Sequence, residues 1–311
     1  MVTEIREAQA LAKAAYGFIA EKVLVDLGWA EFEAMFQDYS SRRHSQLSMT
    51  YIDVLPLYVY QAVGNDAREA LPLAAAWIQF LLSGRILDDV LDDEGIEQPW
   101  RRQDLQETVA AGLFAMGGAN VALSQLADRE ASLDIAEAFN KVLALAARAE
   151  AQRANKDKTV KTCFEIIFAK TGLVFATGVW AAGRLAINNT SDPRLQALYD
   201  FGLHMGVMAQ LIDDCTDLVV DVGKGQWTLP VIHGLSQREH PLYDSLFSLL
   251  GQAEKDTESA TAVATILTEM GSLDWSLQQA GHYQKQAVTT LTETPGINSR
   301  LLINYVTQQN C

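Results

Sequence analysis

Cysteine and positive charge are both scarce in this chain. Its 311 residues carry 3 cysteines, and 24 Lys and Arg stand against 39 Asp and Glu for a formal net charge of -15. Cys163, Cys215 and Cys311 are too scattered for a disulfide framework or a zinc site, and they suit reduced thiols in a cytoplasm. The lack of clustered cations argues against binding of nucleic acid. An anionic substrate therefore needs a local source of positive charge, such as bound metal ions.

Long uncharged apolar runs and linker-like segments are also missing. No stretch of about 18 residues is apolar without a charge, so we expect no membrane-spanning helix. Charges interrupt the N-terminal segment MVTEIREAQALAKAAYGF from the start, unlike a secretory signal, and a cytoplasmic protein is expected. With 49% hydrophobic residues and no Pro-, Ser- or Gly-rich linker, the chain is expected to fold as a single domain over residues 1–311.

Strand-like alternation is nearly absent, and apolar residues recur instead at the helical spacing of three and four residues. The segments with this period are 5–27, 67–91, 105–114, 135–147, 164–182 and 195–220. Turn residues separate them at Gly28, 64–66, 95–99, Gly117-Gly118, 188–193, 223–225 and 295–296. The pattern predicts an all-α fold, a single bundle of about ten or more helices around a central cavity.

A first acidic motif, DDVLDD at residues 88–93, ends the apolar segment 67–91. Asp88 and Asp92 lie one helical turn apart on one face, and Asp89 and Asp93 are predicted to form a second such pair. Like charges at this spacing cost a helix about 0.2–0.5 kcal/mol per pair, and the C-terminal end of a helix repels further negative charge. Carboxylate clusters of this kind suit magnesium, which completes its coordination shell with waters and phosphate oxygens.

A second acidic motif lies at residues 210–221, where Asp213, Asp217 and Asp221 fall on one helical stripe. Either motif alone is more often a solvated acidic helix end than a metal site. Two such motifs, each after a buried helix, favour the metal site. Carboxylates at the ends of buried helices are costly unless cations lie between them, so we expect the two motifs to face one another across the cavity.

One lysine interrupts the apolar segment 164–182. In such surroundings Lys170 either extends its amine to solvent or meets an anion. Beside a magnesium-bound diphosphate, Lys170 would neutralise the leaving group and Thr171 would offer it a hydroxyl.

Taken together, these residues resemble the trans-isoprenyl diphosphate synthase, or polyprenyl synthetase, family of the class I isoprenoid synthase fold. The matching segments are DDVLD at 88–92, KT at 170–171, QLIDDCTD at 210–217, TLPVI at 228–232 and AGHYQKQA at 280–287. The resemblance implies three magnesium ions that bridge both motifs to an allylic prenyl diphosphate. Ionisation then leaves an allylic carbocation, which the double bond of isopentenyl diphosphate attacks.

The resemblance also assigns roles to single residues and implies a homodimer. The leading magnesium ligands are Asp88, Asp92 and Asp213, and the supporting ones are Asp89, Asp214 and Asp217, with Asp221 a further candidate. The catalytic residues that line the allylic site are Lys170, Thr171 and Gln210, and Lys224 is a further substrate-binding residue. In the helix before the first motif, Ser83 leaves room for the product and Phe80 closes the cavity one turn deeper.

The chain departs from the family pattern where isopentenyl diphosphate binds. The family's Gly-Lys-x-x-Arg segment is replaced by SMTYID at residues 48–53, and its paired arginines after the first motif are replaced by Glu97-Gln98. Arg42-Arg43 and Arg101-Arg102 are out of register. Before Thr-Leu-Pro, the usual glycine-lysine reads Gly225-Gln226, with Lys224 displaced.

Each lost charge-assisted bond forgoes about 1.5–3 kcal/mol, so the isopentenyl diphosphate site is expected to be degraded. Chain-elongating prenyltransfer is the family's usual reaction and our first expectation. The alternatives are a terpene synthase, a prenyltransferase with another acceptor, and a catalytically silent regulatory subunit of an active synthase. Retention of both acidic motifs argues against the last.

Overall fold

The structure, a computed structural model, describes residues 2–45, 47–93, 95–153, 155–254 and 256–307. Side chains are described for these residues except 2–5, 44–45, 47–50 and 304–307, and Cys311 lies outside the described residues. Helices and turns account for the described chain, which contains no strand. The predicted all-α fold is confirmed.

The chain divides into two compact units. Unit 1 comprises Met1–Ala138, Gly178–Leu195 and Pro295–Cys311, and unit 2 comprises Phe139–Thr177 and Gln196–Thr294. The boundaries at residues 138, 177 and 195 fall inside helices rather than in linkers. The single domain expected from the sequence stays a prediction.

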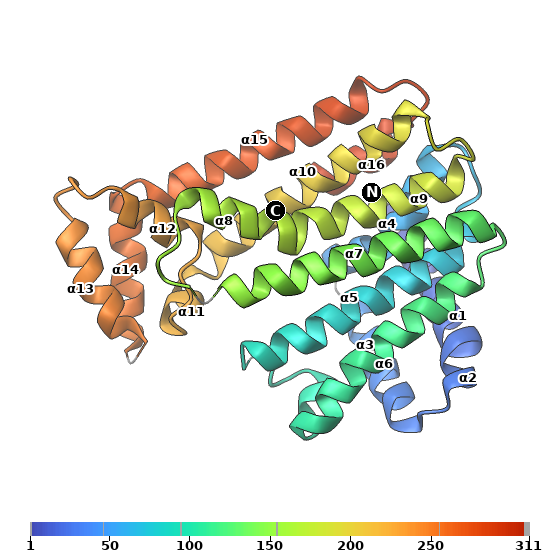
Figure 1. Ribbon diagram of the computed structural model, residues 1–311, viewed down its shortest axis with the longest axis horizontal. Helices are drawn as coiled ribbons and strands as arrows, with labels where there is room; N and C mark the ends of the chain where they lie inside the picture. Colours follow the sequence, from blue (N-terminus) through green and yellow to red (C-terminus); the bar gives the residue numbers. More distant parts are fainter. Residues whose placement is uncertain (1, 46, 94, 154, 255, 308–311) are drawn as a thin grey trace. The chain divides into compact units, whose positions relative to one another are not determined.

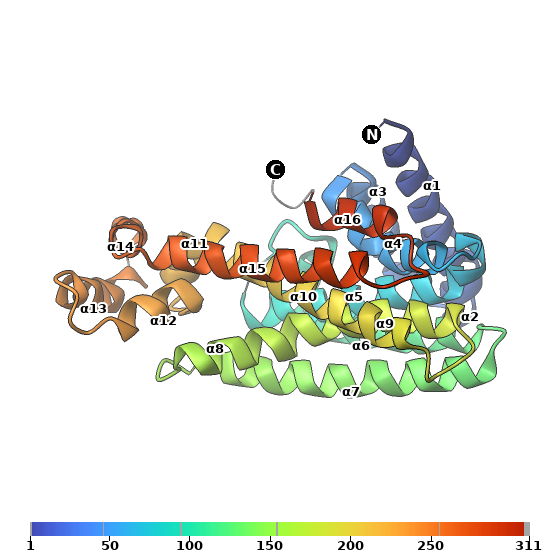
Figure 2. The ribbon, with the colours of Figure 1, turned by 90° about the horizontal axis from the view of Figure 1, so that it is seen from above.

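In unit 1, α5 and α6 run side by side (Figures 1 and 2). The complete helices of this unit are α1 (Val2–Phe18), the π-helical η1 (Ile19–Leu24), α2 (Val25–Leu27), α3 (Ala30–Ser45), α4 (Leu47–Ala62), the short η2 (Ala67–Ala70), α5 (Leu71–Leu91), η3 (Pro99–Arg102), α6 (Leu105–Ser124) and α16 (Ser299–Thr307). Asp104 caps α6 by accepting a hydrogen bond from the backbone N of Glu107 at 2.8 Å. Trp77 and Trp100 are fully buried in this unit.

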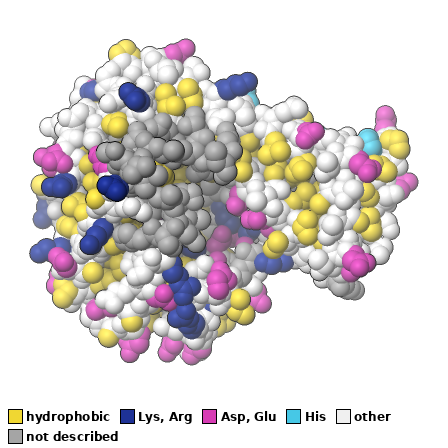
Figure 3. All heavy atoms as spheres, turned by 180° about the vertical axis from the view of Figure 1, so that it is seen from behind, with side chains coloured by type: hydrophobic (Ala, Val, Ile, Leu, Met, Phe, Trp, Pro, Cys, Tyr) yellow, Lys and Arg dark blue, Asp and Glu magenta, His cyan; other side chains and the backbone are white. Residues whose placement is uncertain are grey.

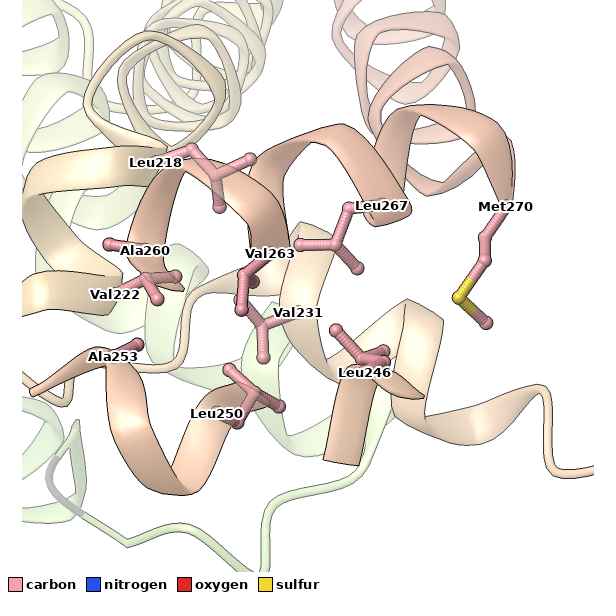
Figure 4. Close-up of a cluster of buried hydrophobic side chains, with 10 residues drawn as sticks. All are labelled: Leu218, Val222, Val231, Leu246, Leu250, Ala253, Ala260, Val263, Leu267 and Met270. Carbon is pink, nitrogen blue, oxygen red and sulfur yellow. The ribbon is translucent and has the colours of Figure 1, made fainter. Parts of the chain in front are cut away.

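Three helices cross the unit boundaries: α7 (Arg129–Arg153), α9 (Leu173–Ala186) and α10 (Pro193–Thr216). The helices wholly in unit 2 are α8 (Val160–Ile167), the π-helical η4 (Phe168–Gly172), α11 (Leu218–Gly223), α12 (Leu229–Ser236), α13 (Tyr243–Ala253), α14 (Thr257–Glu269) and α15 (Ser272–Thr292). Helices α11 to α14 share a buried apolar cluster, in which Val231, Leu250 and Val263 gather (Figure 4). Acidic side chains are scattered among basic ones on the described part of the face in Figure 3.

The predicted helix break at Gly117-Gly118 is wrong, because α6 continues through both residues. A Cβ atom on Gly118 would lie 2.1 Å from Oε1 of Gln79 in α5, and one on Gly112 would lie 2.9 Å from Leu87. Gly118 therefore serves close packing of α6 against α5. The other predicted breaks coincide with helix ends.

Two helical segments are long and apolar enough to cross a membrane by length and composition alone. They are Ala67–Leu91 and Val160–Ala186, each with a mean hydropathy of 1.5 in its most apolar window. Since 67% of each window is buried inside the protein, they are core helices of a soluble protein.

Helix α10 lies very close to η4 and the start of α9. A Cβ atom on Gly202 would approach the carbonyl oxygen of Phe175 to 2.7 Å, and one on Gly206 would approach that of Thr171 to 2.8 Å. Gly202, Gly206 and Gln210 follow one another at four-residue spacing on one helix face. The close approach therefore brings Gln210 beside Thr171, whose Oγ1 donates to Gln210 Oε1 at 2.6 Å.

Gly206→Ala should destabilise the protein and lower its activity. Overpacking costs about 1–3 kcal/mol, which exceeds the gain of up to about 1 kcal/mol from alanine's higher helix propensity. Gly281→Ala in α15 is the matched control, because a Cβ atom there meets nothing within 4 Å. Urea denaturation measures both variants, and an equal gain in their free energies of unfolding would contradict the close approach.

Candidate active site

The first acidic motif ends α5. Asp92 is the C-cap residue of this helix, and its backbone N donates to the carbonyl oxygen of Asp88 at 2.9 Å. Helical geometry therefore persists from Asp88 to Asp92 and places both half-buried carboxylates on one face. The spacing that the sequence predicted for this pair is present.

The predicted second pair of this motif, Asp89 with Asp93, is wrong as a helical pair. Helix α5 ends at Leu91, and Asp93 has a left-handed φ of 50°. Aspartate tolerates the left-handed conformation, which does not continue the helix. Asp93 instead accepts a hydrogen bond from Arg101 at 2.5 Å.

Asp89 is engaged by the loop that follows the motif. Its Oδ2 accepts a hydrogen bond from Trp100 Nε1 at 2.8 Å. Gly95 follows closely, with a φ of 63°, and a Cβ atom on it would lie 2.1 Å from the same oxygen. Asp89 therefore organises the loop, in addition to the supporting metal role that the sequence predicts for it.

Each arginine that could substitute in the isopentenyl diphosphate site is paired with a carboxylate in unit 1. Arg43 and Asp53 form a buried ion pair of 2.5 Å. Asp38 binds Arg42 at 2.9 Å and Arg102 at 3.1 Å, and Arg101 is bound by Asp93. The side chains of residues 48–50 lie outside the described part of the chain.

The second motif keeps its predicted stripe across the junction of α10 and α11. The backbone N of Asp217 donates to Asp213 and that of Asp221 donates to Asp217, each at 2.9 Å. Asp213 and Asp217 are exposed, whereas Asp221 is buried. Although Asp213 stays in contact with solvent, desolvation by the protein around it, followed by repulsion from Asp217 and Asp214, raises its pKa to about 6. Burial and the charge of Asp214 raise the pKa of Asp221 to about 7.

A pocket inside unit 2 brings several predicted residues together. Its lining comprises Arg153, Lys158, Cys163, Ile166, Ile167, Lys170, Gln210, Asp214, Gln226, Trp227, Thr228 and Leu229. Thr171 lies behind this wall and donates to Gln210. Lys224 is exposed and is not part of the lining, so its substrate-binding role stays a prediction.

A chain of hydrogen bonds fixes the polar wall of the pocket. Gln210 Nε2 donates to Asp214 Oδ1 at 2.9 Å, and the backbone N of Leu229 donates to Asp214 Oδ2 at 3.5 Å. Both oxygens of Asp214 thus accept hydrogen bonds, and burial raises its pKa. Asp214 positions Gln210 here, while its predicted metal role is untested.

Lys170 meets an anion. Its Nζ lies 2.5 Å from Glu150 Oε2, and Glu150 Oε1 lies 3.5 Å from Arg153. Lys170 and Thr171 belong to the π-helical turn η4, a conformation that is frequent at functional sites. The sequence predicted an uninterrupted helical period here and gave no sign of the wider turn.

Sequence reasoning missed two cations of the pocket, Arg153 and Lys158. They flank a short connection between α7 and α8, where basic residues are usually solvated surface charges. Burial lowers the pKa of Lys158. The sequence signal that could have found them is Gln226, which occupies a position where the family usually has a lysine. Its presence implies that another residue supplies the positive charge of that lysine.

The sequence profile of the Polyprenyl synthetase family matches residues 53–267. The chain belongs to the polyprenyl synthetase family. It is 24% identical over 276 residues to the octaprenyl diphosphate synthase of Haemophilus influenzae. The alignment covers 78% of this chain and 83% of that protein. Membership of this prenyltransferase family, predicted from the two acidic motifs, is confirmed, and it implies prenyl diphosphate substrates and divalent metals.

Solved structures confirm the fold. The geranylgeranyl pyrophosphate synthetase of Pyrococcus horikoshii matches this polyprenyl synthetase chain with a TM-score of 0.79 at 21% identity, over 97% of this chain and 98% of that one. A polyprenyl synthase of Caulobacter crescentus, crystallised with calcium and isoprenyl diphosphate, matches with a TM-score of 0.76 at 20% identity, over 98% and 96% of the two chains.

Asp221→Asn should stabilise the metal-free protein in a pH-dependent way. The pKa of Asp221 rises from about 3.9 in an unfolded chain to about 7 in the folded protein. The wild-type protein therefore loses stability as the pH rises from about 4 to about 7, by an amount on the order of a few kcal/mol. Urea denaturation in the presence of a chelator should show that the free energy of unfolding of the variant exceeds that of the wild type. This difference should grow as the pH rises through this range and stay constant above it. A difference that does not change with pH would contradict the assignment.

Proposed function

We propose that this member of the family ionises an allylic prenyl diphosphate with magnesium bound by the carboxylates of both acidic motifs. Asp88, Asp92 and Asp213 are the leading ligands, and the resemblance to the family suggests three ions. The donor set fits magnesium, because each motif presents carboxylate oxygens one helical turn apart. Desolvation and, after it, repulsion from Asp217 and Asp214 raise the pKa of Asp213, and a divalent cation would relieve the repulsion.

The observation that carries the proposal is the pocket of unit 2, where Lys170 and Gln210 lie beside the second motif. Lys170 supplies positive charge to a leaving diphosphate. Thr171 and Asp214 hold the side-chain amide of Gln210 in a fixed orientation. Bound magnesium would neutralise the departing diphosphate and stabilise the charge that develops on it.

Chain elongation with isopentenyl diphosphate is the first candidate reaction, and one observation favours a second candidate with another acceptor. The four candidate arginines at positions 42, 43, 101 and 102 are all paired with carboxylates. Breaking a buried pair such as Arg43 with Asp53 costs about 3–5 kcal/mol, so this arginine is poorly available for a diphosphate. The second candidate function is therefore a terpene synthase, or a prenyltransferase with another acceptor.

The remaining expectations stay proposals. Ser83 and Phe80 both lie on the buried part of α5, where we propose that they limit the length of the product. A cytoplasmic location and a homodimer rest on the sequence and on the family resemblance. The silent-subunit alternative is disfavoured, because a protein without catalysis has no need for both acidic motifs.

Incubation with magnesium and geranyl, farnesyl or geranylgeranyl diphosphate, with and without isopentenyl diphosphate, tests the function. We expect magnesium-dependent release of pyrophosphate and longer diphosphates when isopentenyl diphosphate is present. A hydrocarbon or alcohol product released without isopentenyl diphosphate would establish the second candidate and overturn chain elongation. No turnover under any condition would indicate the silent subunit.

Asp88→Ala should lower kcat/KM by at least about a hundredfold, because it removes a ligand of the metal that neutralises the leaving group. Helical content should stay nearly unchanged, since this carboxylate is proposed to serve metal binding rather than packing. Pyrophosphate release and circular dichroism measure the two effects.

Asp93→Ala is the matched control. This residue carries the same charge in the same motif, but it lies outside the helix and pairs with Arg101. It should retain most of the activity. Equal losses in the two variants, or unfolding of the Asp88 variant, would count against the metal-ligand role.

A further inference from the structure

We infer that Arg153 binds the diphosphate of the substrate in place of the lysine that the family pattern expects at position 226. The cation would then come from the C-terminal end of α7 instead of from position 226 in the loop before α12. The inference rests on the proposed function and identifies a further substrate-binding residue in that site.

Arg153 and Gln226 meet inside the pocket. A guanidinium nitrogen of Arg153 donates to Oε1 of Gln226, and both residues line the cavity with Lys170. The amide of Gln226 is thus positioned to orient the guanidinium. The cation of Arg153 lies against the side chain that occupies the expected lysine position.

The charges around the pocket favour an anion. Its lining contains Arg153, Lys158 and Lys170 but a single carboxylate, that of Asp214. Both oxygens of Asp214 already accept hydrogen bonds within the wall. Outside the lining, Glu150 contacts both Lys170 and Arg153, and the charges of Asp213 and Asp221 also act on Arg153.

Two further donors lack partners. Trp227 Nε1 and Thr228 Oγ1 are buried in the pocket wall and have no hydrogen-bond partner among the described residues. Thr228 is the N-cap residue of α12, but its side chain makes no capping bond. A buried donor left unsatisfied is unfavourable, and a ligand that carries only acceptor oxygens would satisfy it. A diphosphate has this chemistry, and the N-terminal end of α12 also favours negative charge.

Arginine suits this position better than a buried lysine. A guanidinium keeps its charge when it is desolvated and binds phosphate oxygens through two parallel N–H groups. The neighbouring Lys158, by contrast, has its pKa lowered by burial, and its Nζ donates to the carbonyl oxygen of Arg153. Lys158 thus helps to hold the end of α7 in place.

A charge swap tests the inference. The variants are Arg153→Gln, the double variant Arg153→Gln with Gln226→Lys, and the control Arg148→Gln on an exposed part of the same helix. Calorimetry measures binding of inorganic pyrophosphate in the presence of magnesium, steady-state kinetics gives KM for the allylic diphosphate, and thermal unfolding gives Tm.

We expect Arg153→Gln to weaken pyrophosphate binding about tenfold or more and to raise KM, with Tm nearly unchanged. The double variant should recover binding to within about threefold of the wild type, because it returns the cation to the loop. The control should behave as the wild type. Unchanged binding in Arg153→Gln would overturn the inference. So would a loss of binding that accompanies a lower Tm and is not recovered by the swap, because Arg153 would then be a structural link.

These results separate the inference from the proposed function. A wild-type protein that turns over allylic diphosphates, while Arg153→Gln binds pyrophosphate normally, refutes the inference alone. A protein that binds pyrophosphate through Arg153 but turns over no prenyl diphosphate refutes the proposed function and leaves the anion site in place.

Discussion

The close contact of α10 with η4 and α9 is the constraint on which the rest of the site depends. Without side chains at Gly202 and Gly206, the two backbones approach each other directly, and the next turn of α10 delivers Gln210 to Thr171. From Gln210 the hydrogen bonds continue to Asp214 and to the first residue of α12. Helix packing therefore sets the position of the polar wall of the pocket, and this packing depends on the two glycines.

The carboxylates of the second motif fall into an exposed pair and a buried pair. Asp213 and Asp217 keep their carboxylates exposed, whereas Asp214 and Asp221 are buried. Burial raises the pKa of both Asp214 and Asp221; hydrogen bonds from Gln210 and Leu229 oppose this rise at Asp214, whereas the charge of Asp214 adds to it at Asp221. In this strongly acidic protein, three basic residues, Arg153, Lys158 and Lys170, line one small pocket.

The fold class, the family and the helix positions were predictable from the sequence because they depend on local periods and on motifs of fixed spacing. The errors fall where a residue's partner is distant in the chain. Gly118 was interpreted as a helix break, but Gln79 on α5 requires it to be glycine. Similarly, no local pattern distinguishes Arg153 from a solvated arginine, since its partner Gln226 lies in another element. Asp93 was misplaced because i,i+4 spacing describes a helix only as far as the helix continues.

The π-helical turn at Phe168–Gly172 connects α8 to α9. Such a turn accommodates one residue more than an α-helical turn, and each residue of an α-helix advances the direction of its side chain by about 100°. Removing a single residue here would let the turn become α-helical, so that α8 and α9 could both keep their present neighbours. A one-residue deletion within Phe168–Gly172 is therefore expected to displace Lys170 and Thr171 while the flanking helices stay in place.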